Sequence, residues 1–141
     1  MKKLILFLSI ALCIFTNSAF AQSSTQAKSQ TKTKALGGIT PEHALEYMKT
    51  TENLIVIEVN TAYWKKKVGF VNAMWIPHDE MEKRFSEIPK GFPVLLHCGL
   101  GVVSVPAYKI LLEKRPDIPE LSYIDGAPLI EEYNEWYKKN K

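Results

Sequence analysis

The sequence contains few cysteines and no cluster of metal-binding residues. Only two of its 141 residues are cysteines, Cys13 and Cys98, and the three histidines, His43, His78 and His97, lie far apart. A structural zinc site takes four closely spaced Cys or His ligands, so we expect no metal centre. If Cys13 is removed with a leader segment, Cys98 is the one cysteine left, and an internal disulfide is excluded.

The first residues have the pattern of an export signal. Lys2 and Lys3 precede an apolar run over residues 4–15, and small residues in the A-x-A pattern end at Ala21. This arrangement is typical of a secretory signal peptide. We therefore expect residues 1–21 to be cleaved after Ala21 and the protein to be periplasmic or secreted. The apolar run is shorter than the about 20 residues that cross a bilayer, so we expect no membrane span after cleavage.

The next segment, residues 22–38, lacks aromatic side chains and consists largely of Ser, Thr, Gln and Lys. Such a composition buries too little apolar surface to order itself. We predict a flexible polar linker over residues 22–38, followed by one domain over residues 39–141, which is long enough to bury a single core.

An excess of positive charge is absent from the predicted domain. Of the 18 Lys and Arg, two lie in residues 1–21 and three in residues 22–38, which leaves 13 against all 15 Asp and Glu. The domain thus carries about −2, whereas the chain carries +3. Because nucleic-acid binding requires a basic face, we exclude nucleic acid as a partner. The lysines at 65–67 are interpreted as a solvated surface that could add some positive field to a nearby site.

Short apolar segments alternate with amphipathic ones along the domain. Strands are predicted at residues 54–59, 74–76, 92–98 and 120–125, and helices at residues 40–50, 79–85, 105–115 and 128–139. The strongest strand segments are apolar throughout, which is typical of parallel strands covered on both sides. The alternation predicts an α/β fold with a small parallel β-sheet flanked by helices on both faces.

A glycine-rich segment follows Cys98 at the end of a predicted strand, where parallel sheets bind ligands. Gly99 and Gly101 permit backbone conformations in which successive N–H groups form a nest for an anion, beside the N-terminus of the next helix. Such a nest would stabilise the thiolate of Cys98 and make it a better nucleophile. Ser104 could donate its hydroxyl or cap the helix.

The histidine beside Cys98 and the tryptophans have an ordinary structural interpretation. His97 precedes Cys98 on the strand, so its side chain should point to the opposite face, and we interpret it as a packed histidine. The tryptophans Trp64, Trp75 and Trp136 could line a pocket, although packing in or against the core is the more common role.

Four segments occur in an order that resembles single-domain rhodanese-like proteins: IEVN at 57–60, GFVNAMWIP at 69–77, CGLGVVS at 98–104 and YIDGAPLIEEYNEW at 123–136. In that family a cysteine accepts sulfane sulfur from a donor such as thiosulfate and passes it to cyanide or another thiol. The resemblance implies that Cys98 is the nucleophile and that no cofactor is needed. It also implies that the persulfide is held by the backbone of Gly99, Leu100, Gly101, Val102, Val103 and Ser104.

The sequence departs from the family pattern at its charged positions. Val103 and Asn60 stand where arginines are usual, Glu58 replaces an aspartate, and Gly69 falls where a histidine is expected. The loop therefore lacks a cation for an anionic donor. Either the donor is less anionic than thiosulfate, or the domain is a weak enzyme. Ser104 also stands where a cysteine phosphatase requires an arginine, which argues against that activity.

Three functions are compatible with these residues. The favoured one is an exported sulfurtransferase that uses a Cys98 persulfide between a small sulfur donor and a thiol or cyanide acceptor. The second is a catalytically weak or inactive binding module for a protein partner or small ligand. The third, a thiol redox protein, is disfavoured because a second, resolving cysteine is absent from the predicted mature chain.

Overall fold

The computed structural model describes residues 32–64 and 69–141, so the expected signal peptide and most of the expected linker lie outside the described residues. In chain order the elements are β1 (Lys34–Ile39), α1 (Pro41–Thr50), β2 (Ile55–Glu58), β3 (Met74–Trp75), α2 (Met81–Arg84), the 3-10 helix η1 (Phe85–Glu87), β4 (Val94–His97), α3 (Ser104–Lys114), β5 (Glu120–Ile124) and α4 (Ile130–Asn140). Among these residues no helix is both long and apolar enough to cross a membrane.

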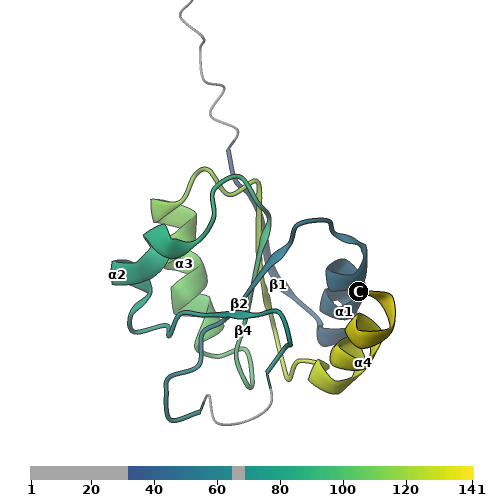
Figure 1. Ribbon diagram of the computed structural model, residues 1–141. Helices are drawn as coiled ribbons and strands as arrows, with labels where there is room; N and C mark the ends of the chain where they lie inside the picture. Colours follow the sequence, from purple (N-terminus) through teal and green to yellow (C-terminus); the bar gives the residue numbers. More distant parts are fainter. Residues whose placement is uncertain (1–31, 65–68) are drawn as a thin grey trace, which may run out of the picture.

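The strands form one five-stranded sheet in the order β1-β5-β4-β2-β3 (Figure 1). Every neighbouring pair is parallel, and β4 lies in the middle between β2 and β5. The α/β fold with a small parallel sheet, predicted from the alternation of segments, is confirmed.

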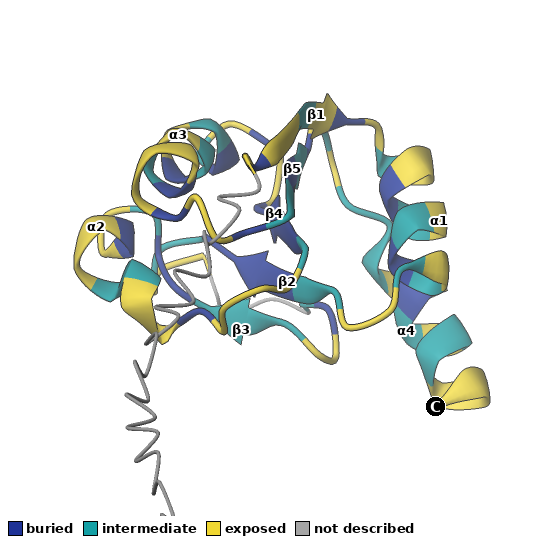
Figure 2. Cartoon of the chain, turned by 90° about the horizontal axis from the view of Figure 1, so that it is seen from above, coloured by how far each residue is buried: buried dark blue, intermediate teal, exposed yellow. Residues whose placement is uncertain are grey.

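Helices cover both faces of the sheet, as predicted (Figure 2). One core lies between the sheet and the α2 and α3 side; its buried members are Ile57, Val59, Ile76, Met81, Ile88, Val94, Leu96, Cys98, Ala107, Leu111, Ile118 and Leu121. The other lies on the α1 and α4 side; its buried members are Ile39, Ala44, Met48, Val56, Phe70, Leu95, Ile124 and Tyr133. Because β2 and β4 contribute to both cores, their side chains are apolar on both faces.

Strand β1 corrects the predicted domain boundary. Lys34–Ile39 pairs with β5, so the expectation of a flexible linker through residue 38 is wrong at its C-terminal end. Pairing with β5 holds this strand, in which Ile39 is the one buried side chain, and composition does not reveal such pairing. The path of β1 requires its two glycines. Gly37 has φ +73° beside a shift in register, and a Cβ on Gly38 would lie 2.9 Å from the Tyr123 ring.

A buried arginine holds the end of α3 against the segment that follows α2. The Arg115 side chain donates to the backbone oxygens of Phe85 (2.6 Å), Ile88 (3.0 Å) and Pro89 (3.2 Å). Its Nε and Nη2 also donate to the two carboxylate oxygens of Asp117, each at 2.7 Å. Since Arg115 is buried, removing it would leave both a carboxylate and several carbonyl oxygens without their donors.

We predict that Arg115→Leu lowers the free energy of unfolding by about 3 kcal/mol or more, because three backbone oxygens lose a charged donor and each unpaired buried group costs about 1–3 kcal/mol. Urea denaturation followed by circular dichroism measures this loss. Arg84→Leu is the matched control, because the guanidinium of Arg84 makes its ion pairs with Glu80 and Glu87 on the exposed surface and should matter much less. Equal effects of the two substitutions would contradict the structural role of Arg115.

Candidate functional site

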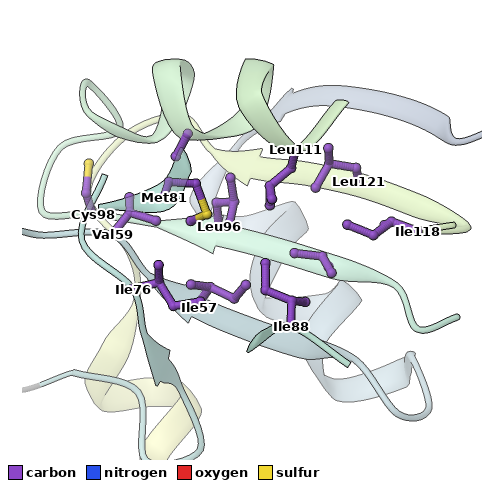
Figure 3. Packing of buried hydrophobic residues seen from close by; sticks show 12 residues of the cluster. Ile57, Val59, Ile76, Met81, Ile88, Leu96, Cys98, Leu111, Ile118 and Leu121 are labelled. Atoms are coloured by element: carbon purple, nitrogen blue, oxygen red, sulfur yellow. The ribbon is translucent and has the colours of Figure 1, made fainter. Parts of the chain in front are cut away.

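Strand β4 determines which way Cys98 faces. Its side chains alternate, so that Val94, Leu96 and Cys98 join the core beneath α2 and α3, whereas Leu95 joins the opposite core. Cys98 follows the last residue of β4 and lies at one end of the row of packed side chains (Figure 3). Its thiol is free, and the residue is 3% exposed.

His97 packs on the other face, as predicted. Its ring meets the Phe70 ring edge to face, with centroids 4.6 Å apart, and is 1% exposed. Neither ring nitrogen has a hydrogen-bond partner among the described residues. Burial lowers the pKa of His97 to about 4, so the ring is neutral at pH 7.

The buried His97 predicts a pH dependence of stability. Its pKa is about 4 in the folded protein and 6.5 when unfolded, so the unfolded chain binds more protons between these values. Lowering the pH from 7.5 to 5 should therefore cost about 2 kcal/mol of stability. A hydrogen bond from Arg115 lowers the pKa of Asp117, and one from Lys34 lowers the pKa of Glu120. The protein loses the stability that these two carboxylates contribute only at still lower pH, when they become protonated.

Denaturation curves of the wild type and His97→Leu at several pH values test this dependence. The variant should lose most of the slope between pH 7.5 and 5. Its stability at pH 7.5 should not fall, because the neutral ring makes no described hydrogen bond that leucine would forfeit. An unchanged slope in His97→Leu would contradict this assignment.

The loop after Cys98 is fixed by the close approach of two backbones. Gly101 has φ +83°, a conformation that favours glycine. A Cβ at this position would lie 2.8 Å from the Gly126 nitrogen and 3.0 Å from the Ile124 oxygen. The loop therefore packs directly against the turn between β5 and α4. Gly99 differs, since a Cβ there would meet nothing within 4 Å.

Alanine substitutions at the two glycines form a matched pair. Gly101→Ala should lower stability by at least about 2 kcal/mol and displace the loop, because the left-handed backbone and the Gly126 contact both oppose a side chain. Gly99→Ala should change stability by about 0.5 kcal/mol or less. Thermal unfolding measures both, and equal shifts would show that the loop is not held in this way.

Several loop amides lack a protein acceptor among the described residues. The Gly99 N–H donates to Asn60 Oδ1 at 3.3 Å, and the Ser104 N–H donates to the Gly101 oxygen at 3.2 Å. The backbone N–H groups between them, at residues 100–103, have no acceptor among the described residues. Four of the six backbone N–H groups in the predicted cradle therefore have no described protein acceptor, and their binding of an anion stays a prediction.

Ser104 does not cap the helix, which corrects one expectation. Val103 occupies the N-cap position, and no side chain caps α3. Ser104 is the first helical residue, and its fully buried Oγ has no partner among the described residues. Donation by the Ser104 hydroxyl to a bound anion stays a prediction.

Cys98 lines a cavity of about 460 Å³, called the Cys98 cavity below. Its lining consists of Glu58, Asn60, Trp64, Gly69, His97, Cys98, Gly99, Leu100, Val102, Val103, Ala127, Pro128 and Ile130. The loop, the end of β2 and the segment before α4 thus converge around the thiol. Of the predicted loop residues, Gly101 and Ser104 lie outside this lining.

The cavity is largely apolar, and the one acidic side chain in its described lining is Glu58. No Lys or Arg is among these lining residues, and the lysines at 65–67 lie outside the described part of the chain. Within residues 32–64 and 69–141 no group of three or more His, Cys, Asp or Glu could hold a metal ion. Among the described residues, backbone amides are therefore the groups that could bind an anionic ligand.

Asn60 connects β2 to the cysteine loop, a role the sequence did not reveal. Its Oδ1 accepts from Gly99, its Nδ2 donates to Glu58 Oε1 (3.1 Å), and its backbone oxygen accepts from Trp75 Nε1 (2.8 Å). The sequence marked Asn60 only as a departure from a pattern. The adjacency of β2 and β4 in the sheet is what brings it to the loop.

The tryptophans are divided between two cavities and a packed position. Trp64 is 58% exposed at the edge of the Cys98 cavity, whereas Trp75 is half-buried. Trp136 lines a second cavity of about 460 Å³ near the end of α1 and α4, which contains neither cysteine nor histidine among its lining residues.

No family model and no curated protein match the sequence. Solved structures do match the fold. A rhodanese-related protein from Thermoplasma volcanium aligns with a TM-score of 0.53 at 16% identity, over 73% of this chain and 92% of that one. A rhodanese homologue from Thermus thermophilus aligns with a TM-score of 0.50 at 24% identity, over 65% and 96%. The domain has a rhodanese-like fold.

A third match supports the same architecture. A protein from Staphylococcus saprophyticus aligns with a TM-score of 0.57 at 14% identity, over 70% of this chain and 93% of that one. The rhodanese-like domain therefore spans nearly the whole length of each of these three structures, and the resemblance seen in the sequence is confirmed at the level of the fold.

Proposed function

We propose that the rhodanese-like domain transfers sulfane sulfur through a persulfide on Cys98. The observation that carries this proposal is the position of the thiol. Cys98 follows the central strand, lines an open cavity, and is followed by four amides without a described protein acceptor. Such amides suit a negatively charged sulfur.

The transfer takes two balanced steps. The Cys98 thiolate attacks the outer sulfur of a donor R–S–SH; a new S–S bond forms on Cys98, the donor S–S bond breaks, and its electron pair leaves with R–S⁻. An acceptor thiolate then attacks the outer sulfur of Cys98–S–SH, and the Cys98 thiolate is regenerated. A small sulfur donor and a thiol or cyanide acceptor are thus the proposed partners. Export through residues 1–21 is part of the proposal, on the sequence pattern alone.

The rim of the Cys98 cavity favours a second candidate, a binding module that has lost efficient catalysis. Leu100 and Val102 are each 72% exposed, and Trp64 is 58% exposed. Exposed apolar side chains around a cavity suit a small apolar ligand or a protein partner. Under this alternative Cys98 would hold no transferable sulfur.

Peptide mass spectrometry separates the two candidates. After incubation with a small organic persulfide, the peptide of residues 91–109 should gain one sulfur on Cys98, and an acceptor thiol should remove it. Cys98→Ser should abolish transfer, whereas Cys13→Ser should leave it unchanged. A Cys98 that gains no sulfur would favour the binding module.

A further inference from the structure

Glu58 presents a carboxylate to the Cys98 cavity. It is the last residue of β2, it is 8% exposed, and it is part of the cavity lining. Its Oε1 accepts from Asn60 Nδ2, and no described Lys, Arg or His forms an ion pair with it. A largely buried carboxylate gains from a nearby positive charge, and the described residues supply none to Glu58, so a bound cation would stabilise it.

The space beside this carboxylate is kept open by a glycine. A Cβ on Gly69 would lie 3.0 Å from Glu58 Oε2, so any larger side chain there would meet the carboxylate. Both residues line the cavity. Oε2 accepts no hydrogen bond from the described residues.

The aromatic ring of Trp64 adds a second feature that suits a cation. Trp64 lines the same cavity and is largely exposed, with its ring braced edge to face against Tyr63 at 5.2 Å. Ammonium groups bind the faces of tryptophan rings. The rest of the lining is largely apolar and includes no described Lys or Arg, so an anionic compound would gain no charge-assisted contact from a described side chain.

We propose that the Cys98 cavity selects its substrates by charge: it accepts thiols or persulfides that carry an ammonium group, and Glu58 is the residue that discriminates against anionic ones. As a statement about substrates, this rests on the proposed sulfur transfer. Glu58 acts on the body of the substrate in the cavity, and the free loop amides act on the sulfur that becomes bound to Cys98.

Charge selection can be measured without any sulfur transfer. Methanethiosulfonate reagents with trimethylammonioethyl, methyl or sulfonatoethyl groups react with a thiolate. The Cys98 thiolate attacks the sulfenyl sulfur, a mixed disulfide forms, and methanesulfinate leaves with the electron pair of the broken S–S bond. The full chain is treated and digested without reductant, and the peptide of residues 91–109 reports Cys98 separately from Cys13. The rate constant of Cys98 with each reagent is divided by the rate constant of 2-mercaptoethanol with the same reagent, which corrects for the reagents' different intrinsic reactivities.

In the wild type the cationic reagent should react at least about tenfold faster than the anionic one after this correction, because a charge a few ångströms away changes the rate by about that factor. Glu58→Gln should reduce the ratio to about one. Trp64→Leu is a second variant at a largely exposed residue, where we expect little effect on folding, and it should reduce the ratio about twofold or more. Glu131→Gln is the control, since it removes the same charge from an exposed position outside the cavity lining and should leave the ratio unchanged.

A wild-type ratio of one or less would overturn the proposal, and so would a ratio that survives Glu58→Gln or a thiol that reacts with none of the reagents. Acceptor assays extend the test to sulfur transfer: cysteamine should outperform 3-mercaptopropionate in kcat/KM, and Glu58→Gln should remove the preference. Charge-selective labelling without persulfide formation would contradict the proposed sulfur transfer and leave a cation-selective cavity.

Discussion

The backbone hydrogen bonds that hold β4 between β2 and β5 fix the position of the Cys98 thiol. A central parallel strand has no freedom to slide, because a shift of one residue would move its apolar side chains to the wrong faces. The pairing of Glu58 with His97 in this register places the ends of β2 and β4 side by side. Asn60 can then reach Gly99, and the cysteine loop begins from a fixed point.

Two opposing electrostatic features lie within the Cys98 cavity. Amides at the start of α3 favour negative charge, whereas the Glu58 carboxylate disfavours it. These features are compatible if they act on different parts of a substrate. Backbone donors suit a small anionic sulfur bound to Cys98, and the carboxylate meets whatever the rest of the molecule presents. Under the proposed function, backbone donors would bind the anionic sulfur even though the arginine side chains expected from the resemblance are absent.

Much of the fold could be predicted from the sequence because its signals are local. The apolar run at Val94–His97 and the glycines after it indicated a buried strand, a turn and a helix, and the structure contains all three. Strand β1 was missed because its order comes from pairing with β5, which lies more than 80 residues away. The contacts of Arg115 and the bridge made by Asn60 were missed for the same reason. Residue type predicted that Cys98 would matter, but only the strand order shows what surrounds it.

The direction of β1 has a consequence for how the molecule can be attached to anything else. All five strands run in the same direction. The chain therefore enters β1 at the end of the sheet opposite to the end where the cysteine loop follows β4. The six residues of β1 separate these two ends of the sheet by about 20 Å. A surface or protein attached ahead of residue 32 would therefore approach the end of the sheet opposite to the cysteine loop, and it would not need to cover that loop.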